Sequence, residues 1–569
     1  MAYFKRDRFS GTAPVVSPRL LAEQFGQIAE NVDLESGRLV SVKDNVDFYT
    51  LQNSARRSVY FYRDTTWLEW DTANVSVVPG PIPNDANDRL YFTDSSYPKY
   101  GTAASLVSSG TGPNQSYRLG IPVPPSAPSV SLSGTADADA TPNDVSYVYT
   151  WVSDLGEEGP PSAPSAILEM TDGQTANIGS MSVPSGSYLF TNGQALKRLY
   201  RSNTGSTNTT FQFVKDVLWT AASTTDNKDA ATLGEVLPSS TWIGPPDDNS
   251  SLYPDGPLLG LIPLSQGVMA GFTGKRFCLS EPFLPHAWPI AYRITTEEDI
   301  VAIASTANGV AALTDGQPYF ITGTEPSAMT AIRIDLAQAC VNRASVVDMG
   351  DYVLYAGPDG LCAIESASGQ VITRGLVSAA QWNTDYYPEF IKAFQHEGTY
   401  VAFWTSGSNH GGWVFDPRGG ENALVTLTET AEVRGGYMHP KSGELYTIVA
   451  NKLRKFRGSS SNKTLKFKSK KFVTPSPVSM GWVSVHANTY PVTVKVWGDG
   501  TLLAHYTISV SGSAYTQATT VPSGISNGTI REPIMRMPAK VAQEWEVQVE
   551  GTDVNEFCLA QSMDEIRST

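Results

Sequence analysis

The 569-residue chain has few charged residues, few cysteines and no long apolar run. Charged side chains make up 17% of the residues, against about 25% in a typical soluble protein. No window of 18 apolar residues occurs, so the sequence predicts no membrane-spanning helix. The four cysteines are scattered and form no C-x-x-C pair. This pattern favours reduced, buried thiols over a disulfide framework or a zinc site.

Positive charge is also scarce. The chain has 41 basic and 56 acidic residues, a net charge of −15, so it lacks the basic footprint needed to grip nucleic acid over its whole surface. Weak contact with DNA stays open. The first nine residues include Lys5, Arg6 and Arg8, but residues 10–14 are polar and turn-like, where a signal peptide would become apolar. We therefore expect a protein made in the cytoplasm and not exported by the standard route.

Turn-forming residues are abundant. The chain has 48 glycines and 37 prolines, which favours many short strands joined by tight turns. The clearest hairpin is at 491–509, where two alternating segments flank Gly498-Asp499-Gly500. We therefore predict an all-β protein. Its length, about four times the ~150 residues of one domain, predicts several domains.

A loose strand–turn–strand repeat runs between residues 250 and 457. Its clearest copies lie at 267–280, 300–321, 345–364, 393–416 and 435–456. The spacing of about 35–55 residues is typical of propeller blades. A meander at 57–95 has the same form, so the sequence predicts a β-propeller of six blades.

Composition changes along the chain predict five parts. A proline-rich stretch, Ile121–Pro128, and the pair Pro245-Pro246 enclose a strand-rich segment that interrupts the blades. The predicted parts are an N-terminal arm with a short helix (1–45), the first propeller blade or blades (46–121), an inserted β-sandwich (122–246), the remaining blades (247–457), and a basic linker with a C-terminal β-sandwich-like domain (458–569).

Motif searching predicts neither a catalytic site nor a cofactor. Gly524–Gly528 matches the G-x-S-x-G nucleophile elbow, but no strand–turn–helix context surrounds it. His396-Glu397 begins an H-E-x-x-H motif that Tyr400 ends without the second histidine. The acidic loops 226–229 and 247–249 lack EF-hand spacing and are expected to be solvated turns. We therefore predict a protein that is not an enzyme and binds no metal. A pair of carboxylates from distant blades, as in glycoside hydrolysis, stays open.

One basic run interrupts the acidic chain. Residues 452–471 hold nine basic side chains and no acidic one. Lys466, Lys468 and Lys470 alternate, so a strand there would present them on one face. Two interpretations stay open: a solvated linker, or a surface for an acidic partner, either a neighbouring subunit or a nucleic-acid backbone. The candidate contact residues are Lys463, Lys466, Lys468, Lys470 and Lys471.

The N-terminal segment carries a family resemblance. The residues concerned are Phe9-Ser10-Gly11, Pro14, Leu20-Leu21, Gln27-Ile28-Ala29, Asn31, Leu34, Gly37 and Leu39. Together they resemble the N-termini of tail nozzle or hub proteins of short-tailed phages, also called tail tubular protein B or packaged-DNA stabilisation protein. Residues 147–162, with 198–202 downstream, resemble the fibronectin-type module common in such proteins.

The resemblance implies a structural subunit of the virion tail, assembled in the host cytoplasm. Such subunits form a homo-oligomeric, hexameric ring that extends the channel of the portal and the head-to-tail adaptor ring. The ring retains and conducts double-stranded DNA, with transient non-specific contact, and supports tail spikes or fibres. An acidic channel lining would repel phosphate and keep DNA from sticking.

The alternative is a carbohydrate-binding or glycan-degrading propeller. The 12 tryptophans and 25 tyrosines provide enough aromatic side chains to line a sugar site. No Asp-box repeat accompanies them.

Overall fold

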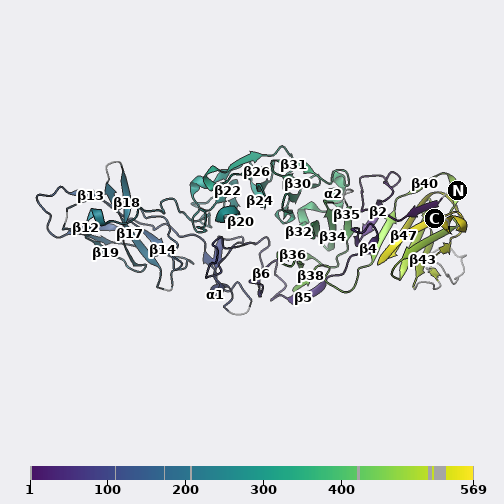
Figure 1. Ribbon diagram of the computed structural model, residues 1–569, viewed down its shortest axis with the longest axis horizontal. Helices are drawn as coiled ribbons and strands as arrows, with labels where there is room; N and C mark the ends of the chain where they lie inside the picture. Colours follow the sequence, from purple (N-terminus) through teal and green to yellow (C-terminus); the bar gives the residue numbers. More distant parts are fainter. Residues whose placement is uncertain are drawn as a thin grey trace. The chain divides into compact units, whose positions relative to one another are not determined.

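The fold is nearly all β. The computed structural model describes residues 3–108, 111–171, 173–191, 193–204, 208–418, 423–509, 515–517 and 534–567. Within these ranges the α-helices are three short segments, α1 (Ala103–Leu106), α2 (Ala379–Asp385) and α3 (Met563–Arg567) (Figure 1). No helix of the described chain is long and apolar enough to cross a membrane. Two compact units are present, residues 1–59 with 336–569, and residues 60–335.

Residues 60–335 contain three four-stranded antiparallel sheets whose strands follow one another in chain order. The first strand of the second sheet, β20, contacts both β8 and β24, the first strands of the other two sheets. This up-and-down sheet with adjacent first strands is the propeller-blade arrangement. The three blades are β8 (Ser76–Pro79), β9 (Leu90–Thr93), β10 (Lys99–Gly101) and β11 (Tyr117–Arg118); β20 (Leu259–Pro263), β21 (Met269–Thr273), β22 (Arg276–Leu279) and β23 (Ile294–Thr295); β24 (Ile300–Thr306), β25 (Gly309–Thr314), β26 (Tyr319–Thr322) and β27 (Thr330–Arg333).

The other unit contains three more blades. They are β28 (Val347–Asp348), β29 (Val353–Ala356), β30 (Leu361–Glu365) and β31 (Ser368–Val371); β32 (Lys392–His396), β33 (Thr399–Ser406), β34 (Asn409–Asp416) and β35 (Ala423–Leu427); β36 (Val433–Met438), β37 (Leu445–Val449), β38 (Lys452–Lys455) and β5 (Val46–Thr50). The last blade is completed by β5, which pairs with β38 from about 400 residues earlier in the chain. The all-β propeller fold predicted from the sequence is confirmed, and six blades lie in the described residues.

Only the second half of the meander at 57–95 belongs to a blade, whereas the sequence predicted that all of it does. Strands β6 (Ser58–Tyr62) and β7 (Thr66–Trp70) form a separate two-stranded sheet, and the blade begins only at β8. Tyr62, Leu68 and Trp70 pack with Leu90 and Phe92 of β9. The hairpin buries its large side chains against the blade instead of extending it, and this packing decides the arrangement.

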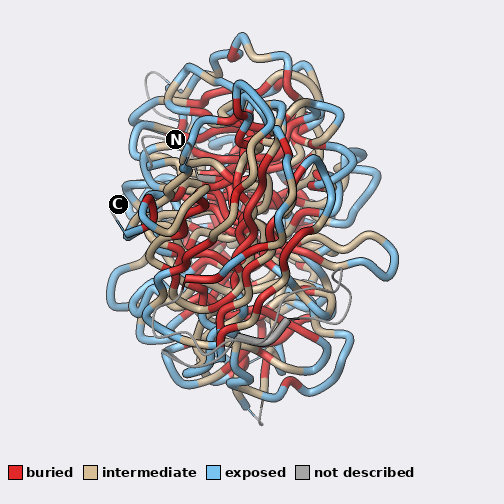
Figure 2. The backbone as a smooth tube through the Cα atoms, turned by 90° about the vertical axis from the view of Figure 1, so that its right-hand side faces the viewer, coloured by how far each residue is buried: buried red, intermediate tan, exposed pale blue. Residues whose placement is uncertain are grey.

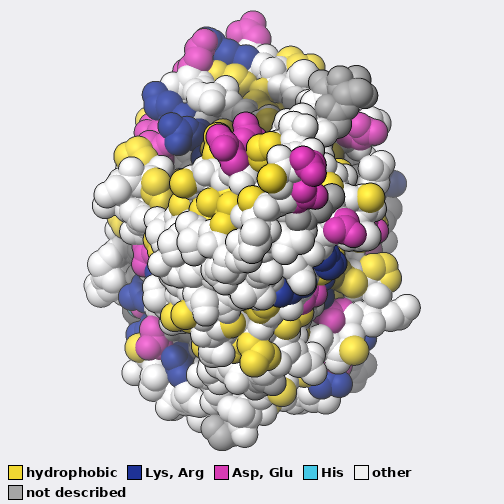
Figure 3. Space-filling model, turned by 90° about the vertical axis from the view of Figure 1, so that its left-hand side faces the viewer, with side chains coloured by type: hydrophobic (Ala, Val, Ile, Leu, Met, Phe, Trp, Pro, Cys, Tyr) yellow, Lys and Arg dark blue, Asp and Glu magenta, His cyan; other side chains and the backbone are white. Residues whose placement is uncertain are grey.

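The inserted segment forms a β-sandwich. Its main sheets are β12-β16-β19 and β14-β17-β18, with a β13-β15 pair. Tyr147, Tyr149 and Trp151 of β14 pack against Ala176 and Ile178 of β16 in its core. The strands are β12 (Ser129–Ser133), β13 (Asn143–Val145), β14 (Tyr147–Val152), β15 (Leu168–Met170), β16 (Thr175–Gly179), β17 (Leu196–Thr204), β18 (Thr209–Leu218) and β19 (Thr224–Asp226). On the face of the molecule drawn in Figure 3, charged side chains of both signs are scattered among hydrophobic and uncharged groups.

The N-terminal segment is not an arm with a short helix, as the sequence predicted. It forms four strands, β1 (Tyr3–Arg6), β2 (Gly26–Glu30), β3 (Val32–Asp33) and β4 (Leu39–Ser41), which join the C-terminal strands. Strands β1 and β4 pair with β47, and β2 pairs with β39. Sheet hydrogen bonds to sequence-distant strands outcompete a local helix here, a tertiary contribution that a short sequence window does not contain.

The C-terminal domain is a second sandwich that includes this segment. One sheet runs β3-β4-β47-β41-β45 with β1 beside β47, and the other runs β2-β39-β46-β42-β43-β44 with β40 beside β46. The strands are β39 (Leu465–Ser469), β40 (Phe472–Ser479), β41 (Trp482–Ala487), β42 (Val492–Gly498), β43 (Thr501–Ile508), β44 (Tyr515–Gln517), β45 (Ile534–Arg536), β46 (Val541–Gly551) and β47 (Asp553–Ala560). The predicted hairpin at 491–509 is confirmed as β42 and β43.

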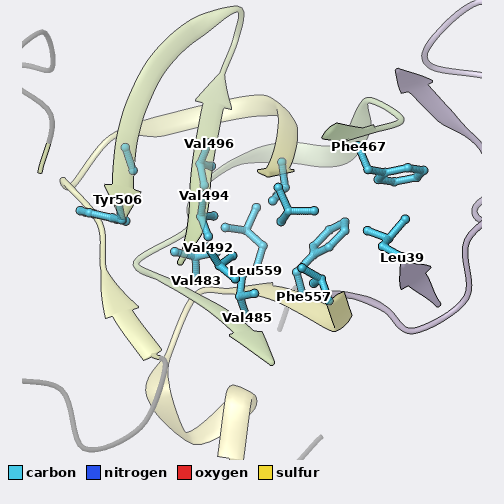
Figure 4. Close-up of a cluster of buried hydrophobic side chains, with 14 of the residues drawn as sticks. Leu39, Phe467, Val483, Val485, Val492, Val494, Val496, Tyr506, Phe557 and Leu559 are labelled. Carbon is cyan, nitrogen blue, oxygen red and sulfur yellow. The ribbon is translucent and has the colours of Figure 1, made fainter. Parts of the chain in front are cut away.

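The core of this domain draws on both ends of the chain. Val492, Val494 and Val496 project from one face of β42, and Leu39 of β4 lies beside Phe557 of β47 (Figure 4). All five side chains are fully buried. Figure 2 shows buried residues concentrated inside the bundle of backbone segments and exposed residues in the loops at its outside. An N-terminal leucine therefore belongs to the C-terminal core.

Replacing Leu39 with alanine should destabilise this domain by about 2–5 kcal/mol, because the change removes buried methyl groups and leaves a cavity. Urea unfolding followed by tryptophan fluorescence measures the loss. Leu20→Ala is the matched control, since Leu20 is 78% exposed. Equal effects of the two substitutions would contradict the burial of Leu39.

Candidate functional site

The predicted contact lysines lie along and around β39. In this strand Leu465, Phe467 and Ser469 are buried, whereas Lys466 and Lys468 share the opposite, polar face. Lys463 precedes the strand, and Lys470 and Lys471 follow it. We call Lys463, Lys466, Lys468, Lys470 and Lys471 the lysine strip.

Four lysines of the strip face carboxylates of their own chain. Lys463 Nζ lies 3.0 Å from Glu429, Lys468 Nζ lies 3.1 Å from Glu546, and Lys471 Nζ lies 3.3 Å from Glu544. Lys466 Nζ and Glu30 are 3.9 Å apart. In the part of the chain that the structure describes, Lys470 alone of the five has no carboxylate within 4 Å. The strip therefore presents little unpaired positive charge.

The partners of the strip come from distant elements. Glu30 is on β2, while Glu544 and Glu546 are on β46. Lys468 also lies over the ring of Trp497, with Nζ 4.6 Å from the centroid. Because Glu546 is only 5% exposed, its charge needs a partner inside the protein. The lysine strip thus neutralises buried and half-buried carboxylates, and a phosphate would have to compete with them.

A further ion pair links β42 to β46 on the polar face of the sheet. Lys495 Nζ lies 2.7 Å from a carboxylate oxygen of Glu550, which also accepts a hydrogen bond from Gln548. Burial opposes ionisation of Glu550, but these donors and the charge of Lys466 outweigh it and hold the pKa of Glu550 below its usual value. Positive and negative side chains therefore alternate over the polar face of the sheet.

A cleft of about 540 Å³ lies near the start of the basic run. It is bordered by β4 and the residues after it, by the β32–β33 turn, and by the end of β38. Its lining includes Ser41, Lys43, His396, Glu397 and Arg457, and we call it the Arg457 cleft. Burial lowers the pKa of His396, although the Glu397 carboxylate opposes the shift.

The broken H-E-x-x-H motif lies at this cleft without a helix. His396 ends β32, and Glu397 occupies the turn with φ of 50°. No three His, Cys, Asp or Glu side chains among the described residues are arranged to hold a metal. The G-x-S-x-G match at 524–528 lies outside the described residues.

The expected solvated turns at the acidic loops are only partly present. Asp226 is 2% exposed, accepts a hydrogen bond from Tyr147 and pairs with Arg201 at 2.8 Å, so the prediction is wrong for this residue. Asp247 and Asp248 pair with a single arginine, Arg118, at 3.3 and 2.6 Å. These carboxylates are already occupied by cations of the protein.

The cysteines offer no reactive thiol. All four are buried, as the sequence predicted. Burial raises the pKa of Cys278, Cys340 and Cys362 to about 12, so these thiols stay protonated at neutral pH.

None of the twelve tryptophans is fully exposed. Seven of the twelve are buried, and the other five are intermediate in exposure. Sugar stacking needs an open aromatic face, so these positions give the carbohydrate alternative no specific support.

Comparison with known proteins does not place the chain in a family. No family model matches it, and no curated protein matches it. Among solved structures, YCF48 from Cyanidioschyzon merolae aligns with 53% of this chain and 95% of its own length, at 9% identity and a TM-score of 0.26. The extracellular domain of a hybrid two-component system from B. thetaiotaomicron aligns with 86% of this chain and 47% of its own length, at 8% identity and a TM-score of 0.21. These TM-scores are too low to carry an argument, so the propeller assignment rests on the sheets themselves.

Glu550→Gln should lower stability at pH 7 by about 1 kcal/mol, the usual size for a part-exposed ion pair. A carboxyl group whose pKa is lower in the folded than in the unfolded protein stabilises the folded state at pH values above its unfolded pKa. This contribution is lost as the pH falls through the pKa of the folded state. The difference in free energy of unfolding between wild type and Glu550→Gln should therefore disappear below about pH 4. Thermal unfolding from pH 7 to pH 3 measures it.

The matched control is Glu389→Gln, because Glu389 is exposed and shows no ion pair among the described residues. Its difference from wild type should stay near zero at every pH. A gap for Glu550→Gln that does not change with pH would contradict the ion-pair interpretation.

Proposed function

We propose that this chain is a non-enzymatic structural subunit of the tail nozzle or hub of a short-tailed phage. The observation that carries the proposal is the structural role of the residues in the N-terminal resemblance. Three of them, Phe9, Gly11 and Asn31, contact a propeller blade, the C-terminal sandwich or both. A shared arrangement of such residues therefore points to a shared architecture.

Phe9 and Gly11 show this directly. Phe9 is 4% exposed, and its ring lies 5.1 Å from Phe467 and 5.9 Å from Phe557. A Cβ on Gly11 would lie 2.4 Å from the carbonyl oxygen of Leu424 at the edge of the propeller blade. Only glycine lets the two backbones approach this closely.

Asn31 is held by four side-chain hydrogen bonds. Its amide nitrogen donates to Thr428 Oγ1 and to the Thr464 carbonyl, at 2.8 and 3.2 Å. Its amide oxygen accepts from the backbone N–H and hydroxyl of Thr428, at 3.0 and 3.2 Å. Thr428 follows the blade strand β35, and Thr464 precedes β39 of the sandwich. Asn31 thus connects the two domains through a fully bonded, buried amide.

The proposed subunit acts in a homo-oligomeric, hexameric ring in the virion tail, assembled in the host cytoplasm. The ring extends the portal–adaptor channel, retains and conducts double-stranded DNA, and supports spikes or fibres. The net charge of −15 and the internally paired lysine strip support a channel protein that touches DNA only transiently, because free cationic surface is what holds phosphate.

Mass spectrometry of DNA-containing particles tests the proposal. Particles purified from the source culture on a density gradient should contain this chain at a few copies each, far fewer than the capsid protein. Absence of the chain from such particles would exclude the nozzle function. Glycan binding or turnover by the purified protein would favour the carbohydrate alternative.

A further inference from the structure

The Arg457 cleft contains two buried polar atoms without a partner. Arg457 Nε and Ser41 Oγ are both shielded from solvent and form no hydrogen bond within the described residues. Ser41 is 5% exposed, and both residues line the cleft. Buried donors in native proteins are almost always satisfied, so such atoms at a cavity wall point to a bound group.

Arg457 also lacks a counter-ion in its immediate surroundings. No carboxylate of the described chain lies within 4 Å of its guanidinium, and burial lowers its pKa against the opposing effects of Asp33 and Glu397. The guanidinium carbon lies 5.2 Å from the ring centroid of Phe456. A mostly buried guanidinium without an ion pair is costly and favours an external anion.

The backbone is strained where it presents this side chain. Arg457 has φ of 52° and Glu397 has φ of 50°, in the left-handed region that residues other than glycine rarely adopt. The Arg457 turn is held by its N–H, which donates to Asn45 Oδ1 at 3.0 Å. Strained backbone at a cavity is common where a side chain is positioned for a ligand.

Three carboxylates line the cleft: one is paired, one is solvated, and the third, Asp33, is half-buried and acts on the charge of Arg457. Glu444 is paired with Lys455, and the Glu397 side chain is 71% exposed, so water screens it. The titratable and charged groups that line the cleft are Asp33, Lys43, His396, Glu397, Glu444, Lys455 and Arg457. The most buried polar groups are Arg457, Ser41 and His396, and each has a hydrogen to donate.

We propose that this cleft binds an oxyanion, the phosphate or carboxylate group of a small molecule, with the Arg457 guanidinium as the cationic donor and Ser41 on the wall of the same cleft. The volume of about 540 Å³ exceeds that of a single ion and falls in the range of small-molecule sites. The site lies within one compact unit, and its function is independent of the proposed place in a tail.

Titration of the full chain with sodium phosphate and with sodium acetate tests the site, by calorimetry and thermal shift at constant ionic strength in chloride. At least one anion should bind and raise the melting temperature. Binding of phosphate alone would identify a phosphate group, and binding of acetate would identify a carboxylate. Arg457→Gln should weaken binding at least tenfold, and Ser41→Ala about threefold.

Arg454→Gln is the matched control, because Arg454 is a nearby cation on β38 that pairs with Asp47 at 2.8 Å and does not line the cleft. It should bind as wild type does. Without the anion, Arg457→Gln should melt no lower than wild type, since it removes an unpaired buried charge. The proposal is overturned if neither phosphate nor acetate binds or raises the melting temperature more than chloride does. It is also overturned if Arg457→Gln and Arg454→Gln weaken anion binding equally, or if Arg457→Gln is unfolded in the absence of anion.

Discussion

The architecture of residues 1–59 with 336–569 depends on the backbone pairing of one short strand. Strand β2 pairs in parallel with blade strand β35 on one edge and antiparallel with sandwich strand β39 on the other. A single eleven-stranded sheet therefore runs from the propeller blade into the C-terminal domain. Pairing on both edges leaves β2 no free edge.

Two further features depend on this strand. The Glu30 carboxylate on β2 faces Lys466, and Gln27, at the register shift between Gly26 and Ile28, donates a hydrogen bond to Glu546. On the other face Ala29 is fully buried in the sandwich core. Ala29 and Glu30 are adjacent in β2 and point to opposite faces, so the strand brings charge to the lysines on one side and apolar surface to the core on the other. Strand β4 joins the same C-terminal domain by pairing with β47, and its last residue, Ser41, lies at the wall of the Arg457 cleft.

The interpretation of the lysines changed most between sequence and structure. A run of nine cations without an anion resembles a surface for an acidic partner. The counter-charges of the lysine strip are 34–436 residues away in the chain, on β2, on β46 and after β35, so no local window contains them. The functional interpretation as a DNA or subunit contact stays a prediction, but the paired geometry favours a role inside the subunit. The prediction of an N-terminal helix was wrong for a related reason, because the strand partners of residues 26–30 lie at 466–469 and at Thr426.

The sequence by itself determined the local features of this protein. Turn residues at short intervals, alternating valines at 492–496 and the strand–turn–strand repeat were enough to predict an all-β propeller with an interrupting sandwich, because strand propensity and turn chemistry act over a few residues. Only the tertiary structure decided that β5 completes the last blade, that Leu39 belongs to the C-terminal core, and which carboxylates face the lysines. Those choices depend on burial and on hydrogen bonds between segments hundreds of residues apart, and their energies exist only once the chain has folded.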